Sequence, residues 1–397
     1  MDFSFTEEQE RFRNSLRKFC GERIAPRAGE IDGREEIPSD LVREMAAFGL
    51  FGMTISGDYG GSGSGFVQAA MTAEQVAWAD MSMAAAVYYL VQAGWGFILE
   101  RYGNREVREE VLPDMVNGKR FLGIASTEGG GGSDIAALST TMEKRGDKLV
   151  LNGAKAYISG VQEAAQNGGG YVTVVKTDPL QGHRGLSLCY LPIRKQAGVT
   201  IGISKQMGRE GISNGFIQIQ EAELPAHYLI GEWNRGFYYA MEGFNCARTL
   251  VAAACLGAAG RALDAGVERI KRRKAFQSPL ARFQGIQFSL AENFAKLESA
   301  RLLVYKAAWM LDRKYSGVSV DHSELNRTVA AAKLVAPAAA FDIIKDVMMW
   351  HGAYGYTREA GLERGLRGVM SYIVGAEGTP NIMKLIISRE LLGKEFS

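Results

Sequence analysis

Apolar residues recur with a helical period over the first part of the chain. Thr6 and Gln9 form a predicted capping box, and apolar side chains then share one helical face until Pro26 ends the pattern. Further helical patterns cover residues 41–51, 68–80 and 83–102. Residues 1–122 therefore predict an all-helical domain.

A different pattern begins near residue 123. Short runs of β-branched and aromatic residues alternate with turn signals such as Asn152-Gly153. These runs cover residues 148–151, 171–176, 186–191 and 215–220. They predict a middle β domain, a barrel or sandwich, over residues 123–232.

Helical periods return after Gly231 and persist toward the end of the chain. They are clearest over residues 286–297, 329–350 and 381–392. Long helices of this kind pack near-antiparallel, which predicts a C-terminal four-helix bundle over residues 233–397. The fold class is thus expected to be α+β, with a β domain between two helical domains.

Composition and charge narrow the possible functions. The 46 basic and 44 acidic residues give a formal net charge of +2, without the basic excess of a nucleic-acid-binding protein. Four scattered cysteines and four histidines predict neither a metal site nor a disulfide framework. The sequence shows no signal-peptide pattern and no uninterrupted apolar run of membrane-spanning length, so we expect a cytoplasmic protein without a membrane span.

A run of four glycines at residues 129–132 is the first candidate binding segment. Successive glycines let the backbone approach a ligand with its N–H groups exposed, and the hydroxyls of Thr127 and Ser133 flank the run. No Lys follows the last glycine and the dinucleotide-binding spacing is missing, so it is not a P-loop or a Rossmann motif. A flexible surface loop is the alternative.

Tyr157 and Ser159 form a second candidate, directly after a predicted strand. The ring could lie against one face of a planar cofactor while the hydroxyl bonds the cofactor's edge. The alternative is a half-buried strand residue.

The third candidate is the basic run at residues 271–274, followed by Phe276. Arg273 could donate to a phosphate group, with Phe276 as an apolar contact. The alternative is a solvated helix end whose positive charges complement the helix dipole.

Glu377 lies among small residues in Gly375-Ala376-Glu377-Gly378-Thr379, before a predicted helix that starts at Pro380. The small side chains of its neighbours do not shield the carboxylate sterically, so it could approach a substrate and take a proton from carbon. An ordinary loop acid is the alternative.

Together these segments resemble the acyl-CoA dehydrogenase family over nearly the whole chain. The matching motifs, in the family's order, are residues 127–134, 152–159, 273–276 with Gln284, 352–357 and 377–379. The resemblance implies the three-domain fold described above and FAD as cofactor. It also implies dehydrogenation of an acyl-CoA to the trans-2-enoyl-CoA, with hydride passing to flavin N5 and electrons to an electron-transfer flavoprotein.

The resemblance further implies a role for each matching position. Glu377 would be the catalytic base. FAD would contact Ile124, Ser126, Thr127, Gly132, Ser133, Tyr157, Ser159, Thr379 and Asn381 of one subunit, and Arg273, Phe276, Gln284, Met349 and Ala353 of a neighbouring subunit. The substrate would contact Ser133, Asn245, Arg248 and Gly378. A dimer is then the smallest functional unit, and a dimer of dimers is expected.

Several positions depart from the family's pattern. Ala275 and Met349 stand where Thr or Ser and Gln are common, which weakens two expected FAD contacts. Gly375-Ala376 precede Glu377 where an aromatic residue is frequent, which predicts room for a branched, cyclic or aryl-substituted acyl group. Ala247 stands where some relatives carry the base, so Glu377 has no rival there. An oxidase or monooxygenase on the same fold and a non-catalytic acyl-CoA-binding scaffold are the competing functions.

Overall fold

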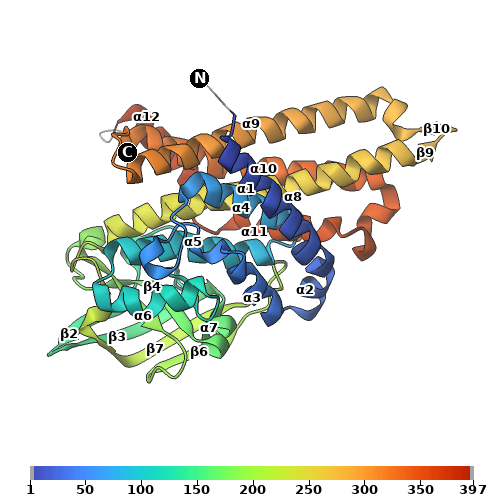
Figure 1. The fold of residues 1–397 in the computed structure, drawn as a ribbon. Helices are drawn as coiled ribbons and strands as arrows, with labels where there is room; N and C mark the ends of the chain where they lie inside the picture. Colours follow the sequence, from blue (N-terminus) through green and yellow to red (C-terminus); the bar gives the residue numbers. More distant parts are fainter. Residues whose placement is uncertain (1–3, 394–397) are drawn as a thin grey trace.

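The N-terminal part of the computed structural model, which describes residues 4–393, is helical as predicted (Figure 1). Its helices are α1 (Glu7–Phe19), α2 (Ala28–Arg34), α3 (Ser39–Ala47), α4 (Gly65–Ala79), α5 (Ala84–Tyr102) and α6 (Arg105–Val116). The capping box is confirmed: the Thr6 hydroxyl accepts from the Gln9 N–H, and the Thr6 N–H donates to Gln9 Oε1 at 3.0 Å. The prediction that the helical pattern ends at Pro26 was wrong. Pro26 lies in a short 3₁₀ helix that leads directly into α2.

The middle part forms a mixed sheet. Its strands are β1 (Phe121–Ala125), β2 (Thr141–Arg145), β3 (Lys148–Ser159), β4 (Gly169–Lys176), β5 (Leu186–Pro192), β6 (Val199–Ile203), β7 (Asn214–Pro225) and β8 (Leu229–Ile230). Their order is β6-β7-β3-β2-β4-β5-β8, with β1 parallel to β4, and α7 (Val161–Asn167) follows β3. Strands β3 and β7 are longer than the sequence runs predicted, because register shifts after Leu151 and Ala156 interrupt the alternation of buried and exposed side chains.

The C-terminal part is a bundle of long helices. Helices α8 (Gly236–Arg272), α9 (Gln284–Tyr315), α10 (His322–His351), α11 (Leu362–Val374) and α12 (Pro380–Leu392) make it up, and a small hairpin of β9 (Lys274–Ala275) and β10 (Ser278–Pro279) joins α8 to α9. Among residues 4–393, α8 is the one helix apolar and long enough to cross a membrane, yet 72% of that stretch is buried inside the protein. It packs against α4, α5, α9 and α10, so its apolar surface is explained by a core position.

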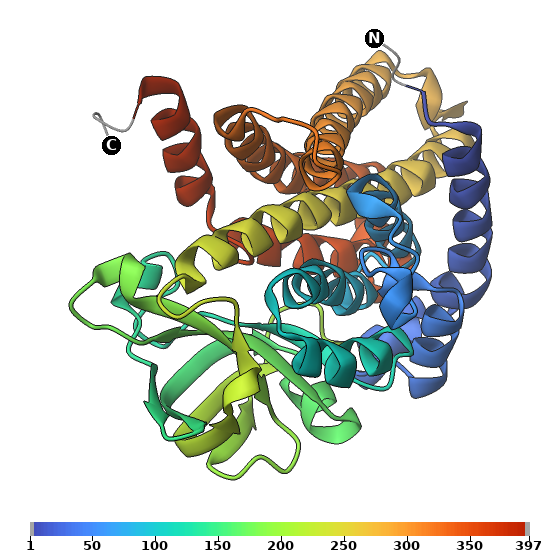
Figure 2. The same ribbon diagram turned by 60° about the vertical axis from the view of Figure 1, so that its left-hand side comes forward.

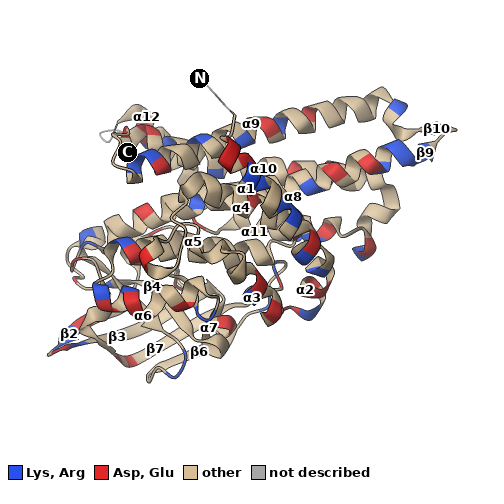
Figure 3. Ribbon diagram, viewed as in Figure 1, with Lys and Arg blue, Asp and Glu red and all other residues tan. Residues whose placement is uncertain are grey.

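The three parts meet along α5 and α8 (Figures 1 and 2). Helix α5 contacts strand β1 on one side and helix α8 on the other, and α8 also contacts β5. Charged residues of both signs are interspersed over the helices in the view of Figure 3, in keeping with the near-balanced composition. The β domain therefore lies against the helices at one end of α8, while the β9–β10 hairpin lies at the other.

Candidate active site

Glu377 lies in the loop between α11 and α12, where the backbone has a conformation that residues other than glycine rarely adopt. The φ angles of Ala376 and Glu377 are +28° and +61°, in the left-handed region. The residue is partly exposed, but its Oε2 is buried and has no hydrogen-bond partner within residues 4–393. Burial raises the pKa of the Glu377 carboxyl to about 7, although the charges of Arg248 and Lys333 act in the opposite direction.

Two buried cations bind the backbone of this loop. Arg248 on α8 donates from Nε to the carbonyl of Glu377 at 2.8 Å and from a terminal nitrogen to Asn245 Oδ1 at 3.2 Å. Lys333 on α10 donates from Nζ to three backbone carbonyls, those of Tyr372 at 2.6 Å, Gly375 at 3.2 Å and Gly378 at 2.7 Å. Burial lowers the pKa of Lys333 to about 8 and that of Arg248 to about 10.

Trp95 on α5 forms an aromatic wall beside the carboxylate. Its fully buried ring packs edge-to-face on Phe244, with 5.3 Å between the ring centroids. Gly243 makes room for it, because a Cβ there would lie 2.4 Å from the Trp95 ring. The indole N–H lies near enough to Glu377 to favour its ionised form, yet the approach falls short of a formed hydrogen bond, since Trp95 Nε1 is buried without an acceptor among the described residues.

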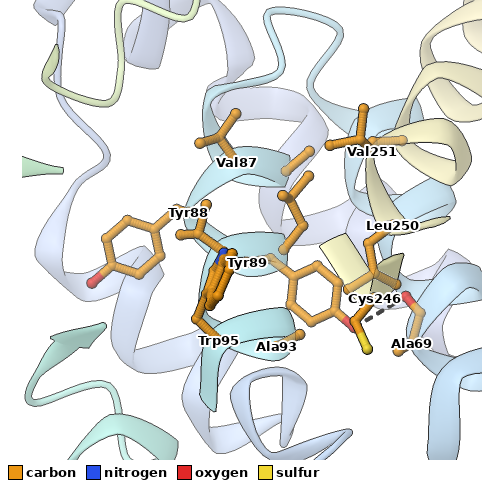
Figure 4. Close-up of a cluster of buried hydrophobic side chains, with 14 of the residues drawn as sticks. Ala69, Val87, Tyr88, Tyr89, Ala93, Trp95, Cys246, Leu250 and Val251 are labelled. Atoms are coloured by element: carbon orange, nitrogen blue, oxygen red, sulfur yellow. Dashed lines mark hydrogen bonds between the residues drawn. The ribbon is translucent and has the colours of Figure 1, made fainter. Parts of the chain in front are cut away.

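Trp95 shares a buried hydrophobic cluster with Tyr88 and Tyr89 of the same helix (Figure 4). Tyr89 donates from its hydroxyl to the carbonyl of Ala69 at 3.0 Å, and Tyr88 packs against the rings of Phe51 and Phe121. Trp95 is therefore the aromatic side chain of this helix that reaches the candidate base.

The glycine-rich segment and the Tyr157 segment lie side by side at the edge of the β domain. The N–H of Ala156 donates to the carbonyl of Thr127 at 2.9 Å, and the buried Lys155 donates to the carbonyl of Ser126 at 3.2 Å. Lys155 also pairs with Glu128 at 2.9 Å, and Glu128 accepts from Ser139 and Thr140. Burial opposes ionisation of Glu128, but these hydrogen bonds and the Lys155 charge lower its pKa to about 2. Glu128 thus fixes one end of the loop, and the four glycines follow it directly in the chain.

This edge of the β domain fits the isoalloxazine part of FAD. Tyr157 has a φ of +60° at the second register shift of β3 and is 70% exposed, so it is not the half-buried strand residue of the alternative. The N–H groups of Gly130 and Gly132 have no acceptor within residues 4–393, and a Cβ at Gly130 would meet nothing within 4 Å. An exposed ring beside free backbone donors matches a planar cofactor with polar edges. Ile124 lies in β1 before the glycine-rich segment, Ser133 directly follows the four glycines, and Ser159 ends β3.

Thr379 and Asn381 lie at the start of α12, directly after the candidate base. The Thr379 hydroxyl accepts from the N–H of Ile382 at 3.3 Å and so caps the helix. Gly378 has a φ of +115°, and a Cβ there would lie 2.8 Å from Met383, so the turn requires glycine. Arg248, which binds Glu377 and Asn245, lies beside Gly378, so these four residues form one cluster, and Thr379 and Asn381 follow it in the chain.

The other positions expected to contact FAD lie elsewhere, around the β9–β10 hairpin at the far end of α8 (Figure 1). Phe276 is 94% exposed and Met349 is 75% exposed. Arg273 follows α8 and Gln284 begins α9, while Ala353 lies in the turn after α10, which the Arg269–Tyr354 contact ties to α8. A single chain does not bring this group to Tyr157 or Glu377.

Sequence reasoning missed Lys333. Lys333 did carry a signal, because it is a single charge inside the apolar helical run Ala330-Ala331-Ala332-Lys333-Leu334-Val335. A lysine on a buried helical face needs acceptors, which the sequence does not identify.

Comparisons with known proteins match nearly the whole chain to one family. The models of the acyl-CoA dehydrogenase N-terminal, middle and C-terminal domains match residues 6–119, 123–222 and 234–392. The chain is 34% identical over 392 residues to a 3-(aryl)acrylate reductase of Clostridium sporogenes, covering 98% of this chain and 99% of that protein. It is 32% identical over 395 residues to a caffeyl-CoA reductase-Etf complex subunit, CarC, of Acetobacterium woodii, covering 98% and 100%.

A solved structure shares the whole fold. The structure of butyryl-CoA dehydrogenase from Megasphaera elsdenii superposes with a TM-score of 0.90 at 28% identity, covering 99% of this chain and 100% of that one. With the three domains matched in order and FAD as the cofactor of such enzymes, the chain belongs to the acyl-CoA dehydrogenase family of oxidoreductases.

Proposed function

We propose that this protein interconverts an acyl-CoA thioester and its trans-2-enoyl-CoA, with Glu377 as the group that exchanges the α proton. The observation that supports this most directly is the Oε2 atom of Glu377, which is buried without a partner in a strained turn. A carboxylate that lacks solvent is a stronger base than one in water, as its pKa of about 7 expresses. Its backbone N–H would face the developing enolate and stabilise the negative charge on the thioester oxygen.

FAD, when bound, supplies the acceptor for the hydride that leaves the β carbon. In this chain Thr127, Ser133, Tyr157 and Ser159 would hold the flavin, with Ile124, Ser126 and Gly132 from the same segments and Thr379 and Asn381 from the start of α12. Trp95, Phe244 and the helices around them would exclude water from the acyl group. Asn245, Arg248 and Gly378, which lie at or beside this loop, would contact the substrate.

We infer that the acyl group carries an aryl or branched substituent. A Cβ at Gly375 would meet nothing within 4 Å, so the residues before the base leave open space. The names of two relatives, a 3-(aryl)acrylate reductase and a caffeyl-CoA reductase subunit, point in the same direction.

The same site supports reduction of the enoyl-CoA, which the names of these two relatives favour. A group with a pKa of about 7 is present in both protonation states at neutral pH, so Glu377 could return a proton to the α carbon as readily as remove it. An electron-transfer flavoprotein is the proposed electron partner in either direction, as the name of the CarC relative suggests.

A homo-oligomer is proposed because the two groups of FAD-contact positions lie at opposite ends of one chain. Exposed apolar side chains on α9 support an interface there; Phe288, Phe294, Leu302 and Trp309 are each at least half exposed. Light scattering coupled to size-exclusion chromatography should give a dimer or a dimer of dimers, and a monomer that retains FAD would contradict the shared site.

The decisive experiment is rapid mixing of the FAD-loaded protein with a panel of acyl-CoA thioesters, followed by flavin absorbance. We expect 3-arylpropionyl-CoA to bleach the flavin, and Glu377→Gln to slow the bleaching by about 10²–10⁴-fold. The matched control is Glu36→Gln, an exposed acid between α2 and α3. Bleaching at the parental rate by Glu377→Gln would refute the proposed base, preference for linear medium chains would refute the aryl substrate, and fast reoxidation by oxygen would indicate an oxidase instead.

A further inference from the structure

Lys333 is a buried lysine without a carboxylate partner. Its side chain is among the largest fully enclosed ones, and the residue is 2% exposed. An ammonium group has three N–H donors, and removing it from water is costly unless each donor finds an acceptor. Here all three donors have one, and each acceptor is a backbone carbonyl.

These three carbonyls belong to residues that lie before and after the candidate base in the sequence. Tyr372 lies in the last turn of α11, whose carbonyls have no partner within the helix, and its carbonyl is the acceptor at 2.6 Å. Gly375 and Gly378 lie on either side of Glu377, and their carbonyls accept at 3.2 and 2.7 Å. A cation at this position also complements the negative end of the helix dipole of α11.

The loop needs such support because its backbone is strained. Ala376 and Glu377 have positive φ angles, and conformations of this kind persist only where surrounding contacts enforce them. Arg248 binds the carbonyl of Glu377 from the α8 side at 2.8 Å, and Lys333 binds the flanking carbonyls from the α10 side. The backbone is thereby fixed on both sides of the one residue whose carboxylate points into the site.

We propose that Lys333 is a positioning residue, whose ammonium group fixes the Glu377 carboxylate in the orientation that proton transfer requires. The inference rests on the proposed function of Glu377. Lys333 touches neither the substrate nor the reacting atoms; it acts through the three carbonyls that it binds. A small displacement of a reacting group is enough to slow a reaction by about 10²-fold.

The proposal gives a pH signature. The pKa of Lys333 is lowered to about 8, mainly by burial, and the groups that face it are Cys255 and Arg248 on α8 and Glu377 in the loop. A neutral amine keeps two donors for three acceptors, so raising the pH through about 8 releases one carbonyl. The rate of flavin reduction should therefore decline on the alkaline side, separately from the rise on the acid side that Glu377 controls.

The test compares Lys333→Met, Lys333→Arg and Glu377→Gln as FAD-loaded proteins, each mixed rapidly with the best thioester across about pH 6 to 10. We expect Lys333→Met to bind the acyl-CoA with unchanged Kd, to reduce its flavin about 10²-fold more slowly, and to lack the alkaline decline. Lys333→Arg should keep part of the rate, and its decline should move to higher pH because a guanidinium stays charged. The control for lost stability is Ile343→Ala, a buried position on the same helix.

Each result separates this inference from the proposed function. Loss of activity in Glu377→Gln, together with a Lys333→Met variant that matches Ile343→Ala in rate and keeps the alkaline decline, would overturn the role of Lys333 and leave the base intact. A Glu377→Gln variant with the parental rate would refute the base itself. If Lys333→Met does not fold, a wild-type profile that stays flat to about pH 10 and coincides with that of Lys333→Arg overturns the proposal.

Discussion

The buried carboxylate of Glu377 should weaken the folded protein as the pH rises. Burial raises its pKa from the ordinary 4.5 to about 7, so the folded state binds the proton more tightly than the unfolded chain does. The associated stability is present in full below about pH 4.5, where both states are protonated, and it is lost progressively as the pH rises to about 7. Above that pH the ionised carboxylate is a fixed cost to folding.

The magnitude follows from the two pKa values. Each pKa unit corresponds to about 1.4 kcal/mol, so the full difference is about 3 kcal/mol. Since the residue is partly exposed while its Oε2 is buried, solvent screening reduces the expected effect to about 2 kcal/mol. Glu377→Gln, which cannot ionise, should therefore be more stable than the parent by about 2 kcal/mol at about pH 8 and equally stable at about pH 4.5.

The assay is urea unfolding of both FAD-loaded proteins, without thioester, at several pH values between about 5 and 8. The exposed Glu36→Gln serves as the control for exchanging an acid for its amide. A constant difference between Glu377→Gln and the parent over this range would refute the reasoning, because it would mean that the folded protein does not desolvate the carboxylate.

Other predictions concern the ring beside the base and the cofactor. Gly243→Ala places a Cβ against Trp95 and should cost about 1–3 kcal/mol in urea unfolding; equal stability would mean that α5 and α8 adapt freely. Tyr157→Ala should weaken FAD retention in equilibrium dialysis without changing the oligomeric state, and unchanged retention would remove the ring from the flavin site. Arg273→Ala should also weaken FAD retention, whereas Arg272→Ala, an exposed neighbour paired with Glu268, should not; equal behaviour would refute the specific role of Arg273.

The domain order and several local features could be predicted from the sequence because neighbouring residues determine them. The capping box of Thr6 and Gln9 is an example, since both partners lie within one turn. Helix α6 was not predicted, because its many charged residues and Pro113 obscure the apolar period. The positive φ of Tyr157 was not predictable either, since it arises from a register shift against β7, a strand about 60 residues further along the chain.

The environment of Glu377 illustrates why only part of the site could be predicted from the sequence. The small residues around the acid are a local pattern that suggested a base, and the resemblance to the family assigned that role to Glu377. Trp95 and Lys333 reach it from α5 and α10, so no spacing in the sequence connects them to it. Their contacts depend on how α5 and α10 pack against the loop that carries Glu377. Packing of that kind leaves only a weak signal in the sequence, such as a single lysine in an apolar helix.

The balance of charges at Glu377 explains how one carboxyl group could serve a reversible proton transfer. In a purely apolar cavity the group would stay protonated at neutral pH and could not act as a base. Beside fully effective cations it would behave as an ordinary acid and bind the α proton too weakly. Burial raises its pKa while Arg248 and Lys333 lower it, and the result is about 7. Lys333 donates to carbonyls of the loop and of α11, and Arg248 donates to the Glu377 carbonyl and to Asn245, so both cations lie near the carboxylate without pairing with it. Its Oε2 is thereby left without a partner among the described residues and could meet the substrate.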